Sequence, residues 1–149
     1  MQSRFVALAS DHAGYELKNV LRDALRQAGY EVRDLGTNGP ESVDYPDFAY
    51  ALGAELKGHE DARGVLVCGT GIGVSIAANR LPHVRAALVH DVTGARLARE
   101  HNDANVIVLG ARLIGVEVAR DCLKAFLETE HAGGRHAKRV TKLGTPPSS

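Results

Sequence analysis

Cysteine is scarce in this sequence, tryptophan is absent, and neither sign of charge is in excess. The two cysteines, Cys68 and Cys122, are too few for a disulfide framework or a cysteine-rich metal site. The 18 Lys and Arg residues balance 18 Asp and Glu residues, so net charge gives no indication of binding to nucleic acid or to a membrane surface. We therefore expect partners of neither kind.

Long apolar runs are also missing, and none could span a bilayer. The first ten residues lack the charged start, long apolar centre and cleavage site of a signal peptide. With so little cysteine, these features favour the reducing cytoplasm. The 149 residues, 44% hydrophobic and 24% charged, suit one globular domain. We expect that domain to span residues 1–141 and residues 142–149, which end in "TPPSS", to form a flexible tail.

Short apolar runs alternate with amphipathic segments along the chain. The runs that predict strands are rich in β-branched residues, and they cover residues 4–9, 30–35, 64–68, 84–89 and 105–110. The segments that predict helices are residues 15–28, 46–57, 73–80, 93–101 and 115–128. Strands that are apolar on both faces are typical of a parallel sheet covered on both sides. The pattern predicts an α/β sandwich of three layers with a doubly wound, five-stranded parallel sheet.

Ligands of such sheets bind beyond the carboxyl ends of the strands. The segments that directly follow the predicted strands are Ser10–Gly14, Gly36–Thr37, Cys68–Gly71, His90–Asp91 and Gly110–Arg112. The polar set His101–Asp103 precedes the last strand instead, which places it at the opposite end of the sheet. A site within one chain therefore cannot easily include His101.

The stretch "VLVCGTGIGVSIAANR" (Val65–Arg80) carries glycines at positions 69, 71 and 73 between a strand and a helix. Such a turn exposes backbone N–H groups near the helix N-terminus, so we expect an anionic oxygen as its ligand. No Gly-Lys-Ser/Thr follows, and Val74 breaks the dinucleotide-binding pattern. Asp91 at the end of the next strand keeps a nucleotide as a minor alternative. A tight turn without any ligand is the structural alternative.

The two cysteines differ in their surroundings. Cys122 lies within an amphipathic helix and is interpreted as a small buried hydrophobic residue. Cys68 ends a strand beside backbone donors and a helix N-terminus, which are features that stabilise a thiolate. It could therefore act as a nucleophile or as a general base.

Three further polar groups have both a functional and a structural interpretation. The Asp11–His12 pair could perform acid–base chemistry or bind an anion, whereas Asp11 could simply cap a helix. His101 could be a cation that interacts favourably with a helix C-terminus. In "GGRHAKR", Arg135 and Arg139 would share one helix face and could bind phosphate, or they could belong to a solvated basic tail.

Five motifs occur in order along the chain: "SDHAG", "DYPDFA", "CGTGIGVSIAANR", "EHNDANVIVLGAR" and "GGRHAKR". Together they resemble the type B ribose-5-phosphate isomerases, a family that also holds subunits of galactose-6-phosphate isomerase. The resemblance extends over residues 4–140. It implies a Rossmann-like α/β fold, a homodimer or dimer of dimers, a phosphorylated sugar as substrate, and neither a metal nor an organic cofactor.

The resemblance also implies a role for each matching residue. Cys68 would move a proton between C2 and C1 of the open-chain sugar, with Thr70 transferring protons at the sugar oxygens. A glutamate replaces this cysteine in one branch of the family, but the segment "GIGVS" here holds no acid. The other implied groups are the anion hole (Gly69, Gly71, Gly73, Asn102), the ring-opening pair (His101, Asp11), the phosphate ligands (His12, Arg135, Arg139) and Tyr45 beside the substrate. His101, Asn102 and Arg112 would come from the partner chain of a dimer.

The expected reaction is therefore the interconversion of ribose 5-phosphate and ribulose 5-phosphate through an enediolate. A six-carbon substrate such as allose 6-phosphate or galactose 6-phosphate is an alternative, with the segment Gly36–Pro46 setting the depth of the pocket. A non-catalytic sensor of sugar phosphates on the same fold is a second alternative. A flavin or nicotinamide enzyme is a third, and the broken dinucleotide pattern opposes it.

Overall fold

The computed structural model describes residues 4–148 of the chain. Within that range the strands are β1 (Phe5–Ser10), β2 (Glu31–Asp34), β3 (Arg63–Cys68), β4 (Ala86–Leu88) and β5 (Val106–Gly110). The helices of the same range are α1 (Tyr15–Gln27), α2 (Tyr45–Leu56), α3 (Ile72–Ala78), α4 (Val92–Asn102), α5 (Val116–Glu128) and α6 (Arg135–Leu143).

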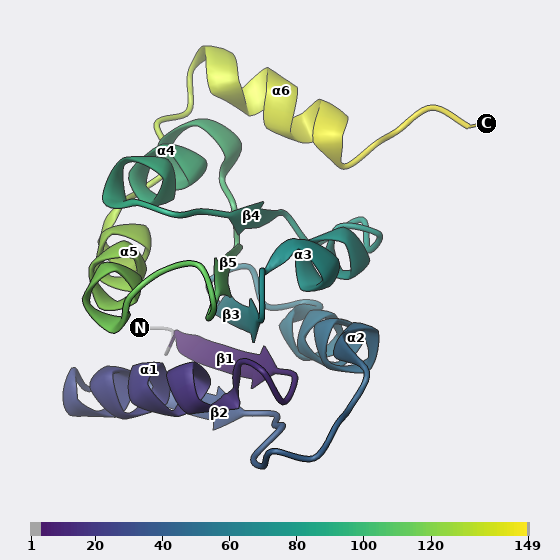
Figure 1. Ribbon diagram of the computed structural model, residues 1–149. Coiled ribbons are helices and arrows are strands. Elements are labelled where there is room, and N and C mark those ends of the chain that lie inside the picture. Colours follow the sequence, from purple (N-terminus) through teal and green to yellow (C-terminus); the bar gives the residue numbers. More distant parts are fainter. Residues whose placement is uncertain (1–3, 149) are drawn as a thin grey trace.

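The strands form one parallel sheet in the order β2-β1-β3-β5-β4. Helices α1, α4 and α5 cover one face of the sheet, and α2 and α3 cover the other (Figure 1). The predicted sandwich of three layers with a five-stranded parallel sheet is thereby confirmed. The chain leaves β1 for β2 on one side and later enters β3 on the other, so the order reverses between β1 and β3. Open α/β sheets place their ligand sites at such a reversal.

The sheet separates two hydrophobic cores, because successive residues of a strand point to opposite faces. Val6 and Leu8 of β1 pack with α1, α4 and α5, where the fully buried Phe126 lies. Phe5 and Ala7 pack with α2 and α3 on the other side. Both faces of the central strands are therefore buried, which explains why their sequences are apolar without alternation.

Strand β4 is shorter than the predicted range of residues 84–89. At its start, the Arg85 N–H donates to the Asn105 side-chain oxygen at 2.7 Å, and the Ala86 N–H donates to the Asn79 side-chain oxygen at 2.8 Å. Side-chain amides thus bind the backbone N–H groups at the start of β4. The other predicted helices and strands agree with the structure to within one or two residues at each end.

Helix α6 is set apart from the rest of the molecule. It packs on α4 and contains no buried residue, and Figure 1 shows it projecting beyond the sheet. The helix continues to Leu143, so the domain boundary predicted after residue 141 falls inside it. Arg135 and Arg139 do lie in a helix, at the spacing that the sequence suggested. Across residues 4–148, no helix combines the length and apolar character needed to cross a membrane.

Candidate active site

A cleft of about 490 Å³ opens at the carboxyl ends of β1 and β3, where the strand order reverses. Four segments that are far apart in the sequence meet there. The residues that line the cleft are Asp11, His12, Ala13, Tyr45, Cys68, Gly69, Thr70, Ile72, Gly73, Ile76 and Arg112. Most of the polar residues predicted from the strand ends are therefore brought together in a single chain.

The glycine turn between β3 and α3 is closely packed on both sides. Gly71 has a φ of 79°, and a Cβ atom there would lie 2.5 Å from a Leu88 methyl carbon. A Cβ atom on Gly73 would lie 2.6 Å from the ring of Tyr45. A side chain at either position would disrupt the turn, because the first requires left-handed backbone and both lack space. The glycines allow the backbone itself to form the wall of the cleft.

Cys68 is the last residue of β3 and forms the floor of the cleft. Its side chain is almost buried, and its Sγ accepts the Gly71 N–H at 3.1 Å. A hydrogen bond donated to sulfur stabilises negative charge on it. Cys122 has the opposite surroundings, because it is fully buried in the core and that burial raises the pKa of its thiol. Cys122 is thus the buried hydrophobic residue that the sequence predicted, and Cys68 lies beside a backbone donor at the end of its strand.

Thr70 is exposed at the rim of the glycine turn. Its Oγ1 accepts the Ile72 N–H at 3.2 Å. A hydroxyl that accepts a hydrogen bond still has its own proton to donate. The hydroxyl therefore keeps a donor at the lining of the cleft.

Asp11 and His12 follow β1 on the other side of the cleft. The Asp11 Oδ1 accepts the N–H groups of Ala13 at 3.0 Å and Gly14 at 3.2 Å, which fixes the turn before α1. The capping position itself is Gly14, so Asp11 stabilises the turn and does not cap the helix directly. The His12 Nδ1 accepts the Val43 N–H at 3.2 Å. In the neutral ring the proton therefore lies on Nε2, which leaves a hydrogen-bond donor for a ligand.

Arg112 lines the cleft of its own chain. Its contribution to the site of a partner chain, which the resemblance implies, stays a prediction. Its backbone N–H donates to the Gly69 carbonyl at 2.9 Å, and a Cβ atom on Gly69 would lie 3.5 Å from its guanidinium carbon. The reason is topological, because β5 is the neighbour of β3 and their carboxyl ends adjoin.

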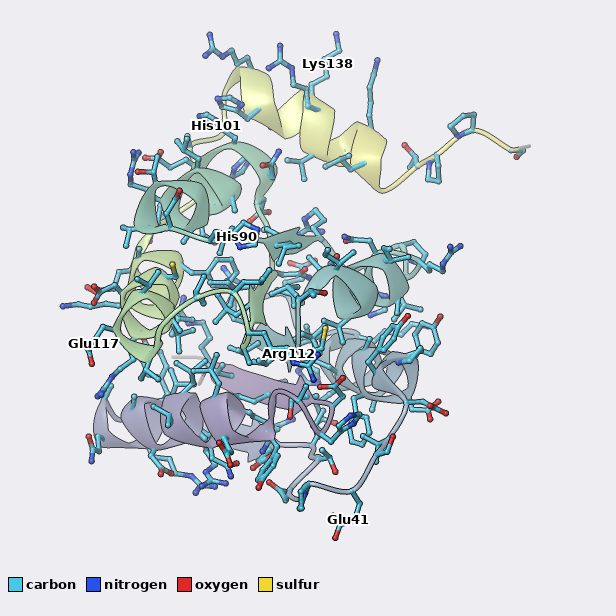
Figure 2. The ribbon with its side chains drawn as sticks, in the orientation of Figure 1. Glu41, His90, His101, Arg112, Glu117 and Lys138 are labelled. Atoms are coloured by element: carbon cyan, nitrogen blue, oxygen red, sulfur yellow. The ribbon has the colours of Figure 1, made fainter. Side chains whose placement is uncertain are left out.

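The remaining predicted residues lie elsewhere. The His101 ring stacks on that of His136, with centroids 4.3 Å apart and planes inclined by 13°, where α4 meets α6. Partial desolvation and the neighbouring His101 lower the pKa of His136. Asn102 lines a separate hollow beside Leu143, and Arg135 and Arg139 are exposed on α6. Figure 2 shows His101 beside α6 and well apart from Arg112.

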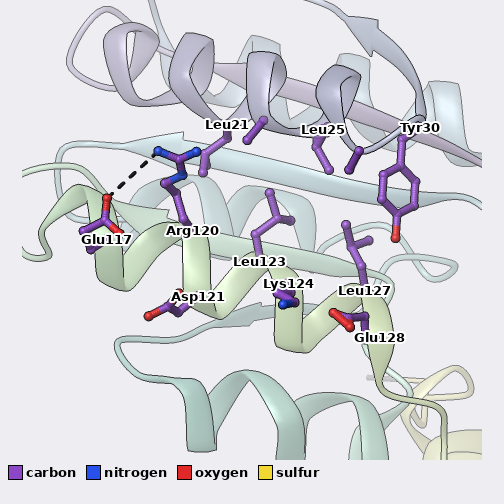
Figure 3. Close-up of a pocket in the computed structure, with 12 residues that line it drawn as sticks. Leu21, Leu25, Tyr30, Glu117, Arg120, Asp121, Leu123, Lys124, Leu127 and Glu128 are labelled. Atoms are coloured by element: carbon purple, nitrogen blue, oxygen red, sulfur yellow. Dashed lines mark ion pairs between the residues drawn. The ribbon is translucent and has the colours of Figure 1, made fainter.

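A larger hollow of about 630 Å³ lies between α1 and α5 (Figure 3). Its floor is apolar and includes Leu21, Leu25 and Leu123, and its rim holds charged residues such as Glu117 and Arg120, which are 4.0 Å apart. None of the predicted site residues lines it. The chemistry is therefore concentrated in the smaller cleft.

Sequence reasoning missed the apolar rim of the cleft and misjudged one acid. Ile72 and Ile76 are about half exposed there, although a helical apolar pattern normally predicts burial. Asp91, the possible ribose ligand, instead caps α4 by accepting the Gly94 N–H at 2.6 Å. Among residues 4–148, no three His, Cys, Asp or Glu side chains gather as a metal-binding group.

Comparisons with known proteins show the family. The family model described as Ribose/Galactose Isomerase matches residues 6–143. Ribose-5-phosphate isomerase B of Escherichia coli is 41% identical over 138 residues, covering 93% of each chain. D-erythrulose-4-phosphate isomerase of Pectobacterium atrosepticum is 44% identical over 140 residues, covering 93% of this chain and 92% of its own.

Solved structures agree with the sequence comparisons. A ribose 5-phosphate isomerase of Thermotoga maritima superposes with a TM-score of 0.92 at 47% identity, covering 97% of this chain and 99% of its own. Ribose-5-phosphate isomerase B of Mycoplasma genitalium with bound ribulose 5-phosphate gives a TM-score of 0.92 at 38% identity, covering 96% of this chain and 95% of its own. The chain therefore belongs to the ribose/galactose isomerase family.

Proposed function

We propose that this protein interconverts ribose 5-phosphate and ribulose 5-phosphate through an enediolate. The observation that supports this most directly is the cleft, where a thiol, the backbone of the glycine turn, a carboxylate, an imidazole and a guanidinium adjoin. The names of the Escherichia coli and Mycoplasma genitalium relatives favour the same reaction.

Cys68 acts as the base in the proposed reaction. Its thiolate removes the proton from C2 of the open-chain aldose and returns it to C1. Thr70 gives a proton to O1 and accepts one from O2, so an aldehyde at C1 becomes a ketone at C2. The backbone N–H groups of Gly69, Thr70 and Gly73 stabilise the negative charge of the enediolate, because they are held in place before the charge develops. The N–H groups of Gly71 and Ile72 bind Cys68 and Thr70 instead.

His12 and Arg112 hold the phosphate group. His12 donates from Nε2 and Arg112 from its guanidinium, and both belong to the same chain as Cys68. Guanidinium groups suit this role because they bind phosphate oxygens in pairs.

The remaining groups come from a second copy of the chain in the proposed homodimer or dimer of dimers. His101 and Asn102 end α4, and Arg135 and Arg139 lie on α6, all outside the cleft of their own chain. The exposed Ile72 and Ile76 give the cleft an apolar rim that a second chain would cover. The partner's His101 would then open the furanose ring together with Asp11.

The test is the conversion of ribose 5-phosphate by wild type, Cys68→Ala and Cys122→Ala, each with and without EDTA. We expect wild type and Cys122→Ala to be active under both conditions, and Cys68→Ala to be inactive while still binding the substrate. Near-normal kcat in Cys68→Ala would contradict its role as the base. Loss of wild-type activity in EDTA would contradict a metal-free reaction.

The identity of the sugar is tested with the same preparation. The Pectobacterium relative is named for a four-carbon substrate, so members of this family differ in the sugar they accept. Allose 6-phosphate and galactose 6-phosphate are the six-carbon alternatives. A higher kcat/KM for any of these than for ribose 5-phosphate would replace the proposed substrate, and binding without conversion would favour a sensor.

A further inference from the structure

A lysine is fully buried beneath the loop that leads to the cleft. Lys18 belongs to α1, and its side chain has no exposed surface. Its Nζ donates to both carboxylate oxygens of Asp34 at 2.8 and 2.9 Å, to Asn38 Oδ1 at 2.8 Å and to Asn19 Oδ1 at 2.9 Å. Burial of a charged group is unfavourable unless it is fully hydrogen-bonded. Lys18 satisfies that condition with acceptors that include Asp34, at the end of β2, and Asn38, in the loop that follows.

The acceptors of Lys18 fix the first half of the loop between β2 and α2. Asp34 ends β2 and also accepts the Gly36 N–H at 3.0 Å. The Ser10 N–H donates to the Gly36 carbonyl, and the Thr37 N–H donates to the Ser10 carbonyl, both at 2.9 Å. This half of the loop is thereby attached to the residue that precedes Asp11.

The second half of the loop forms the edge of the cleft. The Val43 N–H donates to the His12 Nδ1 at 3.2 Å, and Tyr45, which follows closely, lies against Gly73. No side chain of residues 37–47 is buried, and apolar packing begins only with Phe48, which lies against the core. Figure 2 shows Glu41 at the outer end of the loop, away from the sheet. The position of the loop therefore depends on its polar attachments.

We propose that Lys18 is a positioning residue that fixes this loop, and through it His12 and Tyr45, at the distance required by a five-carbon sugar phosphate. The inference rests on the proposed function, since it assumes that the cleft binds a sugar phosphate. Without Lys18, the loop moves outward, Val43 no longer fixes the tautomer of His12, and the phosphate ligand loses its orientation. The deeper cleft then discriminates less against a longer sugar.

The test compares Lys18→Met, which keeps the length of the side chain but removes its donors, with Arg33→Met as a matched control. Arg33 lies on the same strand as Asp34 and pairs with Glu55 at 2.9 Å, away from the loop. For Lys18→Met we expect KM for ribose 5-phosphate to rise about tenfold with a smaller change in kcat, because a displaced ligand group is costly. The preference for ribose 5-phosphate over allose 6-phosphate should fall, and Arg33→Met should change neither quantity.

A second readout does not depend on catalysis. The ¹⁵N shifts of the His12 ring should indicate the Nε2–H tautomer in wild type and a mixture of tautomers in Lys18→Met. If wild type converts no sugar phosphate, the proposed function fails and these shifts alone decide the positioning role. If Lys18→Met does not fold, Asn38→Ala, which removes only the acceptor in the loop, is read in the same way. Kinetics and shifts equal to those of Arg33→Met would overturn the proposal.

Discussion

Mixing two inactive variants tests whether each site is shared between two chains. In the proposed dimer, Cys68→Ala removes the base from its own cleft, and His101→Ala removes a group from the cleft of its partner. A mixed dimer therefore has one site with both lesions and one site with none. Random pairing of equal amounts makes about half of the dimers mixed, so about one quarter of the wild-type activity should return.

The magnitude follows from where the structure places the residues. Asp11 and Cys68 line the same cleft of one chain, so mixing Asp11→Asn with Cys68→Ala repairs no site and provides the control. Activity is measured after exchange of the subunits, and native mass spectrometry of differently tagged chains verifies that mixed dimers have formed. Mixed dimers that remain inactive would refute the shared site, and equal recovery in the control would refute the placement of Asp11.

Three further outcomes are expected. Gly71→Ala should lower the free energy of unfolding by about 2–4 kcal/mol in urea titrations, because it combines left-handed backbone with overpacking against Leu88. Gly115 has open space around it, so Gly115→Ala should change the free energy of unfolding little. Arg112→Ala should raise KM for ribose 5-phosphate about tenfold or more with little loss of kcat, and an unchanged KM would place the phosphate elsewhere. Burial would raise the pKa of Asp34, but hydrogen bonds from Lys18 and the Gly36 N–H hold it below its ordinary value near 3.8. As the pH falls, the Asp34 carboxylate is protonated in the unfolded chain before it is protonated in the folded chain. Its contribution to the free energy of unfolding is therefore complete at neutral pH and is lost as the pH drops below about 4. Asp34→Asn should flatten that decline, measured as urea midpoints from pH 6 to pH 3.

The fold could be predicted because the central strands carry an unambiguous signal. Val6 to Ala9 are apolar on both faces, which is expected only where helices cover the sheet on both sides. Strand β4 is shorter than its apolar run indicated, and the side chains of Asn79 and Asn105 bind the backbone at its start. Those contacts bring together residues that are distant in the sequence, so no local pattern could indicate them.

The candidate site was predictable where topology governs it. Asp11 and Cys68 end neighbouring strands, and the strand-end rule placed them together correctly. The same rule placed Arg112 with them. Its contribution to the site of a partner chain, which the resemblance implies, stays a prediction. The topological argument also separated His101 from the cleft.

Lys18 shows what sequence patterns could not provide. Charged residues on an amphipathic helix normally face solvent, and Lys18 follows Leu17 in such a helix. Its burial depends on its acceptors Asp34, the last residue of β2, and Asn38, in the loop that follows β2. The periodicity of one helix contains no information about acceptors that another segment supplies.

In the proposed dimer, the exposure of α6 would link order at the C-terminus to protein concentration. Nine residues are too few to form a stable helix in water without tertiary packing, and none of those in α6 is buried within its own chain. Association with a second chain would provide the missing packing, so by mass action dilution would disorder this helix before the two cores unfold. Amide hydrogen exchange in residues 135–143 would then report on the fraction of assembled protein, and specific activity should decline in parallel with protection.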